Sequence, residues 1–276
     1  MSEETFDRLP MSPSEPRVEA AGSMGLAEKL LAEKGDLKPY NTWMGITTSK
    51  KTYPDDMVLD FARWGVENSN RFMLVIADAM QVFNKMAIKG IDPFRMNEQQ
   101  RRDFERDVRD YKRAARKRQG ELRTLFKEAG LENVRVRLWS DLIKVLRGRD
   151  WRDEFVVDSF IQMAYIPGLD ETFDSQMKNI VQAHAGHILG RSEGNHETAE
   201  FVASLYPREQ LVLTLALSTL GVYKYVIKIG PEGERAYDQA ALDIFRDGFG
   251  SFRGKLDPNT TFASGAVYLR QKGNHS

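Results

Sequence analysis

An unbroken apolar run within residues 71–78 is the feature that most constrains how this chain can fold. Its sequence, Arg-Phe-Met-Leu-Val-Ile-Ala-Asp, shows no alternation of polar and apolar side chains. A strand of this kind has both faces buried, which is typical of a parallel sheet covered by helices. A shorter apolar stretch, Trp43–Thr47, precedes it, and a proline and two aspartates at 54–56 open a helix between the two. This β-α-β order predicts a parallel strand pair with a right-handed crossover.

The remaining pattern predicts an α/β fold with a mostly parallel sheet and helices on both faces. Further strands are expected at 134–138, 223–229 and 262–269, and helices at 27–34, 97–129, 140–146, 153–164, 171–189, 198–204, 208–220 and 237–246. A length of 276 residues suits one large domain of this class. Residues 1–25 are rich in Pro, Ser and Glu and predict a disordered tail, which leaves 26–276 as a single domain.

The composition narrows the choice of partners and compartment. The formal net charge is zero, so a polyanionic partner would have to meet a local basic patch. There are no cysteines, which excludes disulfides and cysteine-ligated metals. No apolar run is long enough to span a membrane, and the acidic N-terminus lacks the apolar core of a signal peptide. We therefore expect a cytoplasmic protein without membrane partners, and we favour a monomer.

Residues 43–53 form the first candidate site. In the sequence Trp-Met-Gly-Ile-Thr-Thr-Ser-Lys-Lys-Thr-Tyr, an apolar run is followed by three hydroxyl side chains and two lysines. Open α/β sheets bind ligands at the carboxyl ends of their strands, where such a hydroxyl can act as a nucleophile if a neighbouring group takes its proton. The lysines would attract phosphate. The alternative is a solvated turn whose hydroxyls cap the next helix.

The helix expected at 97–129 is the second candidate, because residues 101–127 carry eleven Lys or Arg against five Asp or Glu, a local charge of +6. Basic residues recur three or four apart and share one face: Arg102, Arg106, Arg109, Arg113 and Arg116, with Lys117 beside them. An apolar stripe that includes Phe104, Val108 and Leu122 forms the packing face. Aspartates at 103, 107 and 110 can pair with the arginines, as on an ordinary solvated helix. The other interpretation is binding to a phosphate backbone.

Other segments carry weaker signals. Asp78 and Asn84 would lie at the carboxyl edge of the sheet, unless Asp78 simply caps the next helix. His184 and His187 lie three apart but lack a third metal ligand, and neither a phosphate-binding loop nor a dinucleotide fingerprint is present, so we expect no metal and no cofactor. Residues 228–238 gather carboxylates after a strand, which could bind a guanidinium or could merely begin a helix.

Several of these segments, taken in order, resemble the cyclodipeptide synthases. In that family a strand ends in Gly, an aliphatic residue and a nucleophilic Ser, and Gly45-Ile46-Thr47 fits this frame. Residues 76–90 are similar in spacing to a second family segment, 138–141 (Leu-Trp-Ser-Asp) resemble a recurring Arg-Trp-Ser-Asp-like one, and the basic helix lies where the family has its tRNA-binding helix. The resemblance covers about residues 40–230. It implies a Rossmann-like domain, similar to the catalytic domain of class I aminoacyl-tRNA synthetases, that makes a cyclic dipeptide from two aminoacyl-tRNAs.

The chain also departs from the family pattern. Thr47 replaces the nucleophilic Ser, and Lys50 stands where the family has Asn. Tyr206 and Glu209 are the nearest counterpart of a Tyr-x-x-x-Glu motif, one residue too close, and Tyr223 or Tyr225 stands in for a missing Tyr-His pair. These departures indicate a divergent branch. We favour the fungal arginine-containing cyclodipeptide synthases, because the acidic segment 228–238 could supply a guanidinium pocket.

The resemblance implies a role for each candidate. Thr47 would accept the first aminoacyl group, with Ser49 or Thr48 as a fallback, and Tyr206 and Glu209 would move protons or hold the substrate amine. The substrate-binding residues would be Gly45, Asp78, Asn84, Tyr225, Glu234 and Asp238. The basic row would hold aminoacyl-tRNA by its phosphates. Two alternatives remain open, an RNA-binding protein that kept the fold without the chemistry, and an unrelated small-molecule transferase.

Overall fold

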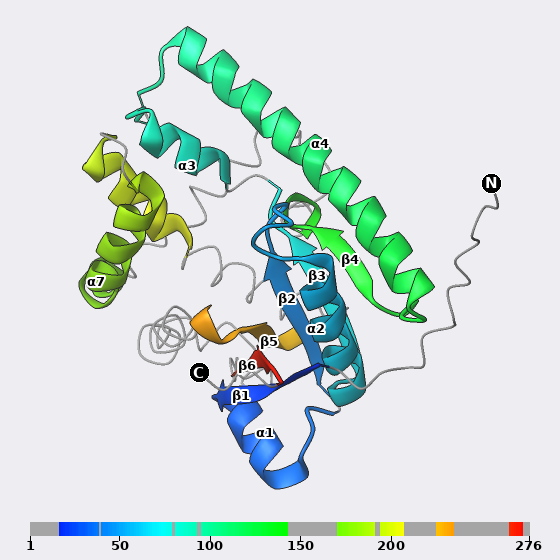
Figure 1. Cartoon of the computed structure of the whole chain (residues 1–276). Coiled ribbons are helices and arrows are strands. Elements are labelled where there is room, and N and C mark those ends of the chain that lie inside the picture. The colour runs from blue at the N-terminus through cyan, green and yellow to red at the C-terminus, as the bar shows by residue number, and fades with distance from the viewer. Residues whose placement is uncertain are drawn as a thin grey trace, which may run out of the picture.

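A single six-stranded sheet organises the part of the chain that the structure describes. This computed structural model describes residues 17–38, 40–78, 81–92, 95–142, 170–190, 194–206, 225–234 and 265–272. The strands are β1 (Val18–Met24), β2 (Asn41–Ile46), β3 (Arg71–Ile76), β4 (Arg135–Leu138), β5 (Tyr225–Pro231) and β6 (Gly265–Gln271), in the order β1-β6-β5-β2-β3-β4 (Figure 1). Every neighbouring pair is parallel except β1 and β6. The predicted α/β fold with a mostly parallel sheet is confirmed.

Helices cover both faces of this sheet. They are α1 (Leu26–Lys34), α2 (Asp55–Asn68), α3 (Gln81–Ile88), α4 (Glu98–Glu128), α7 (Asp170–Leu189) and a helix at 196–206. One core contains Met44, Leu74 and residues of α1, α2 and the C-terminal half of α4. The other core contains Trp43, Met73 and residues of α3, the N-terminal half of α4, α7 and helix 196–206. Adjacent residues of β2 and β3 therefore belong to opposite cores, as the two-residue period of a strand requires.

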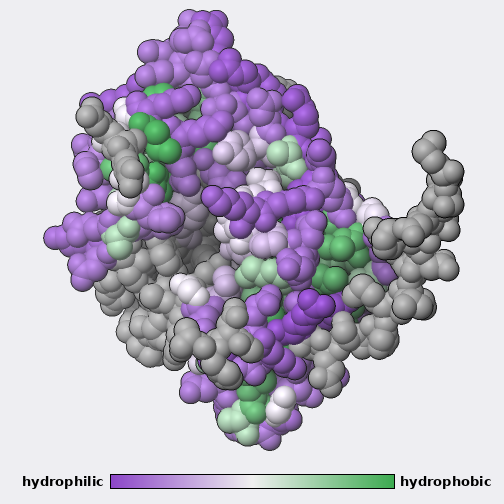
Figure 2. Space-filling view, in the orientation of Figure 1, coloured by the Kyte–Doolittle hydropathy of each residue, from purple (hydrophilic) through white to green (hydrophobic). Residues whose placement is uncertain are grey.

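Helix α4 runs for 31 residues along the molecule. At its start the side chain of Asn97 accepts a hydrogen bond from the Gln100 N–H, and the Gln100 side chain accepts one from the Asn97 N–H, both over 2.9 Å. This reciprocal cap satisfies N–H groups that the first turn leaves unpaired. Gly130, with a φ of 72°, ends the helix as predicted. The outer surface over α4 is hydrophilic (Figure 2), in keeping with its basic face.

Strand β2 lies where the direction of sheet growth reverses. The chain first adds β3 and β4 on one side of β2, and later places β5 and β6 on the other side. Diverging connections leave a crevice at the carboxyl ends of the strands on either side of such a switch point, which is where open α/β sheets bind ligands. The topology therefore directs attention to the end of β2 and to neighbouring β5.

The N-terminal boundary predicted from the sequence was wrong. Residues 18–24 are not part of a disordered tail, because they form β1, which pairs antiparallel with β6. Small residues dominate this strand, and its partner lies about 250 residues further along the chain, so no local pattern reveals it. The predictions for 153–164, 208–220, 237–246 and most of 140–146 lie outside the described residues. Among the described helices, none combines the length and apolarity needed to cross a membrane.

Candidate active site

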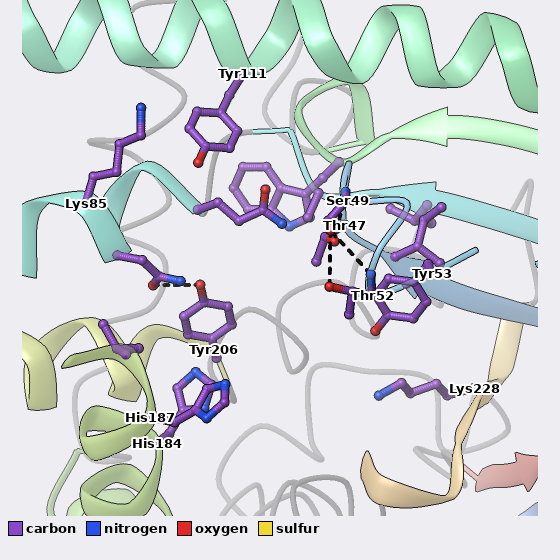
Figure 3. A pocket seen from close by; sticks show the side chains of 18 of the residues that line it. Thr47, Ser49, Thr52, Tyr53, Lys85, Tyr111, His184, His187, Tyr206 and Lys228 are labelled. Carbon is purple, nitrogen blue, oxygen red and sulfur yellow. Dashed lines mark hydrogen bonds between the residues drawn. The ribbon is translucent and has the colours of Figure 1, made fainter. Parts of the chain in front are cut away.

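A cavity of about 670 Å³ opens at the carboxyl ends of β2 and β3 (Figure 3). Its described walls come from β2 and the loop after it, from β3 and β5, and from helices α3, α4, α7 and 196–206. Aromatic side chains line it at Trp43, Tyr53, Tyr111, Trp139 and Tyr206. The volume falls in the range of about 300–1,000 Å³ that is common for ligand pockets.

Hydroxyl side chains of the loop after β2 form one wall. Thr47, Ser49 and Thr52 all line the cavity, and the Ser49 N–H donates to the Thr47 Oγ1 over 3.2 Å. The Ser49 Oγ accepts hydrogen bonds from the N–H and the hydroxyl of Thr52, both over 3.3 Å. Both candidate nucleophiles thus accept hydrogen bonds, which would stabilise negative charge on the oxygen. Thr48 instead faces Gln81, with its Oγ1 3.5 Å from the Gln81 Oε1.

This loop is anchored to helix α4 by charged side chains. The buried guanidinium of Arg118 donates to the carboxylate of Asp55 and to the carbonyl oxygen of Tyr53, the latter over 3.0 Å. Lys50 bridges Asp55 at 3.3 Å and Glu121 at 3.0 Å. Burial raises the pKa of Asp55, but the hydrogen bonds and charges of Arg118 and Lys50 outweigh it and hold that pKa below its ordinary value. Of the two lysines predicted to attract phosphate, Lys50 is therefore engaged with two acids on the protein.

Tyr206 and Asn84 meet on the opposite wall of the cavity. The Tyr206 hydroxyl donates to the Asn84 Oδ1 over 2.8 Å, which joins helix 196–206 to α3. Since a phenol has one proton, this bond leaves its oxygen as an acceptor toward the cavity. The ring of His184 lies edge-on to the Tyr206 ring, 4.8 Å between centroids, and His187 follows one turn later. Burial, and then the neighbouring His187, lower the pKa of His184.

Two lysines place positive charge at this cavity. Lys85 binds Asp107 over 3.2 Å and lies 5.1 Å from the centre of the Tyr111 ring. Lys228 is buried in β5 beside Trp43 of β2 and extends toward the cavity (Figure 3). No carboxylate occurs among the described residues that line the cavity. Helix α4 reaches this space through Tyr111, so the basic helix and the hydroxyl loop border the same cavity.

Asp78 lies just after the carboxyl end of β3, at the edge where it was predicted, but it does not line the cavity. It is fully buried, and its carboxylate accepts hydrogen bonds from both the N–H and the hydroxyl of Ser140. Burial raises the pKa of Asp78, while the bonds to Ser140 and the charge of Lys112 oppose the rise. The two hydrogen bonds of Asp78 to Ser140 link the segments that follow β3 and β4.

The basic row on α4 is partly neutralised. Arg102 pairs with Glu98, Arg106 with Asp103 and Arg113 with Asp110, at 3.2, 2.8 and 3.2 Å. These pairs fit the ordinary solvated helix considered from the sequence. Within the described ranges, Arg109 and Arg116 are exposed and have no acidic partner, and neither has Lys117. The unpaired cations are therefore a subset of the predicted row.

The structure gathers five predicted site residues around one cavity: Gly45, Thr47, Ser49, Asn84 and Tyr206. Glu209 and Asp238, and the side chains of Tyr225 and Glu234, lie outside the described residues. Reasoning from sequence missed Lys228, whose signal was a charge inside an apolar strand. It also missed Tyr111 of α4, and it considered His184 and His187 only as metal ligands. The described residues contain no cluster of three or more potential metal ligands.

Solved structures that are similar to this chain include several cyclodipeptide synthases. No protein-family model matches the chain. No curated protein matches it either. A cyclodipeptide synthase from Fluoribacter dumoffii is similar with a TM-score of 0.59 at 13% identity, over 92% of this chain and 97% of that one. A cyclo(L-leucyl-L-phenylalanyl) synthase gives 0.55 at 17% identity, over 92% and 98%.

A Mycobacterium tuberculosis protein is also similar, with a TM-score of 0.54 at 13% identity over 97% of this chain and 99% of that one, and its structure relates cyclodipeptide synthetases to type I tRNA synthetases. Identities this low establish likeness of fold and leave the chemistry of this chain to its own residues. The chain therefore has the fold of the cyclodipeptide synthases, which resembles that of class I aminoacyl-tRNA synthetases.

Proposed function

We propose that this protein is an aminoacyl-tRNA-dependent cyclodipeptide synthase. The observation that carries the proposal is the meeting of hydroxyl groups, an oriented tyrosine and a side chain of the basic helix around one cavity. Thr47 and Ser49 supply candidate nucleophiles, Tyr206 faces them, and Tyr111 of α4 borders the same space. The cavity lies at the switch point of the sheet, where the fold places ligands.

The first half-reaction is transfer of an aminoacyl group from tRNA to the enzyme. The Thr47 hydroxyl attacks the carbonyl carbon of the aminoacyl ester, loses its proton, and the 3′-terminal hydroxyl of the tRNA leaves with a proton. Ser49 is the fallback nucleophile, and as a primary alcohol it is the less hindered one. The Ser49 N–H, 3.2 Å from the Thr47 oxygen, stabilises charge on that oxygen. The aminoacyl-tRNA ester is exchanged for an acyl-enzyme ester of similar energy, so no nucleoside triphosphate is needed.

The second half-reaction uses the amine of another aminoacyl-tRNA. Its nitrogen attacks the acyl-enzyme ester, the peptide bond forms, and the enzyme hydroxyl is released. The free amine of the resulting dipeptide then attacks its own ester to tRNA, which closes the ring and releases the tRNA. The Tyr206 oxygen, fixed as an acceptor by Asn84, is suited to hold the N–H groups of the amine. Glu209 is proposed to assist, as the resemblance implies.

The basic helix is the proposed docking surface for tRNA. Arg109, Arg116 and Lys117 are exposed without acidic partners among the described residues, so they can meet phosphates at little desolvation cost. Arg102, Arg106 and Arg113 would first exchange an exposed ion pair for a phosphate, which costs little because exposed pairs contribute at most about 1 kcal/mol.

An arginyl group remains the proposed first substrate, on the strength of the acidic segment 228–238 alone. Its guanidinium would have to be held by Glu234 and Asp238. The described wall supplies Lys85 and Lys228 and no carboxylate, so this substrate preference is separate from the proposed reaction. Supplying arginyl-tRNA alone, and then each other aminoacyl-tRNA in turn, tests the preference without affecting the broader proposal.

Mass analysis provides the test of function. The protein is incubated with bulk tRNA charged with a radiolabelled amino-acid mixture, and cyclic dipeptides and labelled protein are measured. The wild-type protein should form both, and Thr47→Ala should lose the label, with Ser49→Ala as the matched comparison. Full activity in Thr47→Ala would transfer the role to Ser49. The replacement of the family serine by Thr47 favours a second function, RNA binding without catalysis, and tRNA binding with no cyclic dipeptide would establish it.

A further inference from the structure

The cavity needs a group that accepts a proton when an amine attacks an ester. Among its described lining residues there is no carboxylate. The two lysines are Lys85, which is paired with Asp107, and Lys228, and a lysine of ordinary pKa is protonated near neutral pH. The Tyr206 hydroxyl already donates to Asn84. The remaining basic side chains on the described wall are the imidazoles of His184 and His187. A neutral imidazole is the side chain best suited to accept a proton near neutral pH.

His184 is the better placed of the two. Its ring lies against the Tyr206 ring, 4.8 Å between centroids. His187 is exposed, and its ring centroid lies 6.2 Å from that of His184. Figure 3 shows both imidazoles beside Tyr206, across the cavity from Thr47 and Ser49. An acyl group on Thr47 or Ser49 would extend into the space between, and an amine held at Tyr206 would approach it from the side of His184.

We propose that His184 is the general base for peptide-bond formation, taking a proton from the α-amino nitrogen of the second aminoacyl group as that nitrogen attacks the acyl-enzyme. This inference rests on the function proposed above. The C–N bond forms and the ester C–O bond to the enzyme hydroxyl breaks. The proton moves from nitrogen to the imidazole, and the resulting imidazolium returns it to the departing oxygen, so that His184 ends the cycle neutral.

The charges around His184 agree with this role. Burial lowers its pKa, and the neighbouring His187 on α7 lowers it further, so the neutral base predominates at pH 7. The other titratable groups on the described cavity wall are Tyr206 from helix 196–206, Lys85 from α3, Tyr111 from α4, Lys228 from β5 and Tyr53 from the loop after β2. A protonated lysine nearby disfavours a positive charge on His184. An imidazolium formed there during the reaction would therefore return its proton readily.

The test separates the two half-reactions. The protein is first loaded from tRNA charged with a radiolabelled amino-acid mixture, and free tRNA is removed. O-methylhydroxylamine, a weakly basic amine, is then added, and loss of label from the protein is timed. His184→Gln should load like the wild type and release the label about 100-fold or more slowly. His196→Gln, an exposed histidine outside the cavity wall, is the matched control and should behave like the wild type.

Two further measurements distinguish a base from a structural residue. Added imidazole should restore release in His184→Ala, because it can occupy the space of the lost ring. In the wild type, release should slow as the pH falls through the pKa of His184, and the profile of His184→Gln, which lacks the imidazole, corrects for protonation of the probe amine. Release from His184→Gln within about twofold of wild type, absence of imidazole rescue, or a flat wild-type pH profile would each overturn the assignment. A wild-type protein that never acquires the label would instead remove the proposed function.

Discussion

The guanidinium of Arg118 donates a hydrogen bond to the backbone carbonyl of Tyr53 over 3.0 Å, which joins helix α4 to the end of the hydroxyl-rich loop. The same guanidinium binds Asp55, at the first turn of α2. The carbonyl of Ser49 in turn accepts a hydrogen bond from the Tyr53 N–H over 3.0 Å. Helix α4, which carries the surface proposed for tRNA, is therefore linked to Ser49, one of the two candidate nucleophiles, through two consecutive hydrogen bonds.

Arg118→Leu should destabilise the protein. The change leaves the Tyr53 carbonyl and one side of the Asp55 carboxylate without their partner, and Asp55 is partly exposed, so we expect a loss of about 1–3 kcal/mol in the free energy of unfolding. Arg116→Leu, on the exposed face of the same helix, should stay within about 0.5 kcal/mol. Urea unfolding of the three proteins provides the comparison. Equal losses in both variants would mean that the link is not what stabilises this region.

The size of that loss should depend on pH. The pKa of Asp55 is held below its ordinary 3.8 in the folded protein, with Arg118 the largest contributor to the lowering. A depressed acid pKa contributes stability above the unfolded value, and this stability is lost as the pH falls through the folded value. The difference between wild type and Arg118→Leu should therefore be greatest near neutrality and shrink below pH 3.8. A difference that does not change with pH would exclude Asp55 as the partner concerned.

Asp78→Asn should be tolerated better than Asp78→Ala. The amide oxygen can accept from the Ser140 N–H and the amide nitrogen can donate to the Ser140 hydroxyl, so both bonds to Ser140 have a replacement. Alanine leaves both Ser140 groups buried and unpaired, at a cost of about 2–3 kcal/mol. Thermal or urea unfolding at pH 7 gives the ranking. Equal destabilisation by the two changes would show that the negative charge itself is required.

The buried carboxyl of Asp78 predicts a pH dependence of stability opposite in sign to that of Asp55. Because burial raises the pKa of Asp78, the folded protein holds this proton more tightly, and stability falls as the pH rises from the ordinary value of 3.8 through the folded pKa. Asp78→Asn removes this dependence. Relative to wild type, the variant should gain stability between acid and neutral pH, and a constant offset would contradict the assignment.

Tyr206 and Asn84 should behave as one unit in the proposed reaction. Tyr206→Phe removes the phenol that faces the amine, and Asn84→Leu removes its acceptor, so each should lower the rate of dipeptide formation by about 10–100-fold. The double variant should be no slower than the slower single variant, because both changes disrupt the same contact. Loading with the first aminoacyl group, measured separately, should change little. If the rate loss of the double variant equalled the product of the two single losses, the two residues would act independently.

The sequence was sufficient where structure is specified locally. The apolar run of β3, the acidic start of α2 and the glycine after α4 each follow from neighbouring residues. Contacts between distant residues were not accessible in this way. β1 depends on β6, and Asp78 depends on Ser140, 62 residues later. Lys228 could have been noticed, because a lysine inside a central apolar strand needs a polar surface to face, but only the sheet order places it beside Trp43.

Salt dependence provides the check on the basic helix. Each lysine or arginine that neutralises a phosphate releases a counterion and adds about one unit to the slope of log affinity against log salt. Arg109 and Arg116 have no acidic partner within the described part of the chain, so Arg109→Gln with Arg116→Gln should lower the slope for uncharged tRNA by about two. Their exposed positions predict no loss of folding stability.

The matched control changes equal charge at the opposite end of the molecule. Lys29→Gln with Lys34→Gln on α1, which lies far from α4 (Figure 1), removes the same two positive charges and should leave the slope unaltered. If tRNA were attracted only by overall charge, both double variants would lower affinity alike, because the screened field depends on net charge. A slope that falls in the α4 double variant and not in the α1 double variant would locate the phosphates on α4, the helix whose Tyr111 borders the cavity.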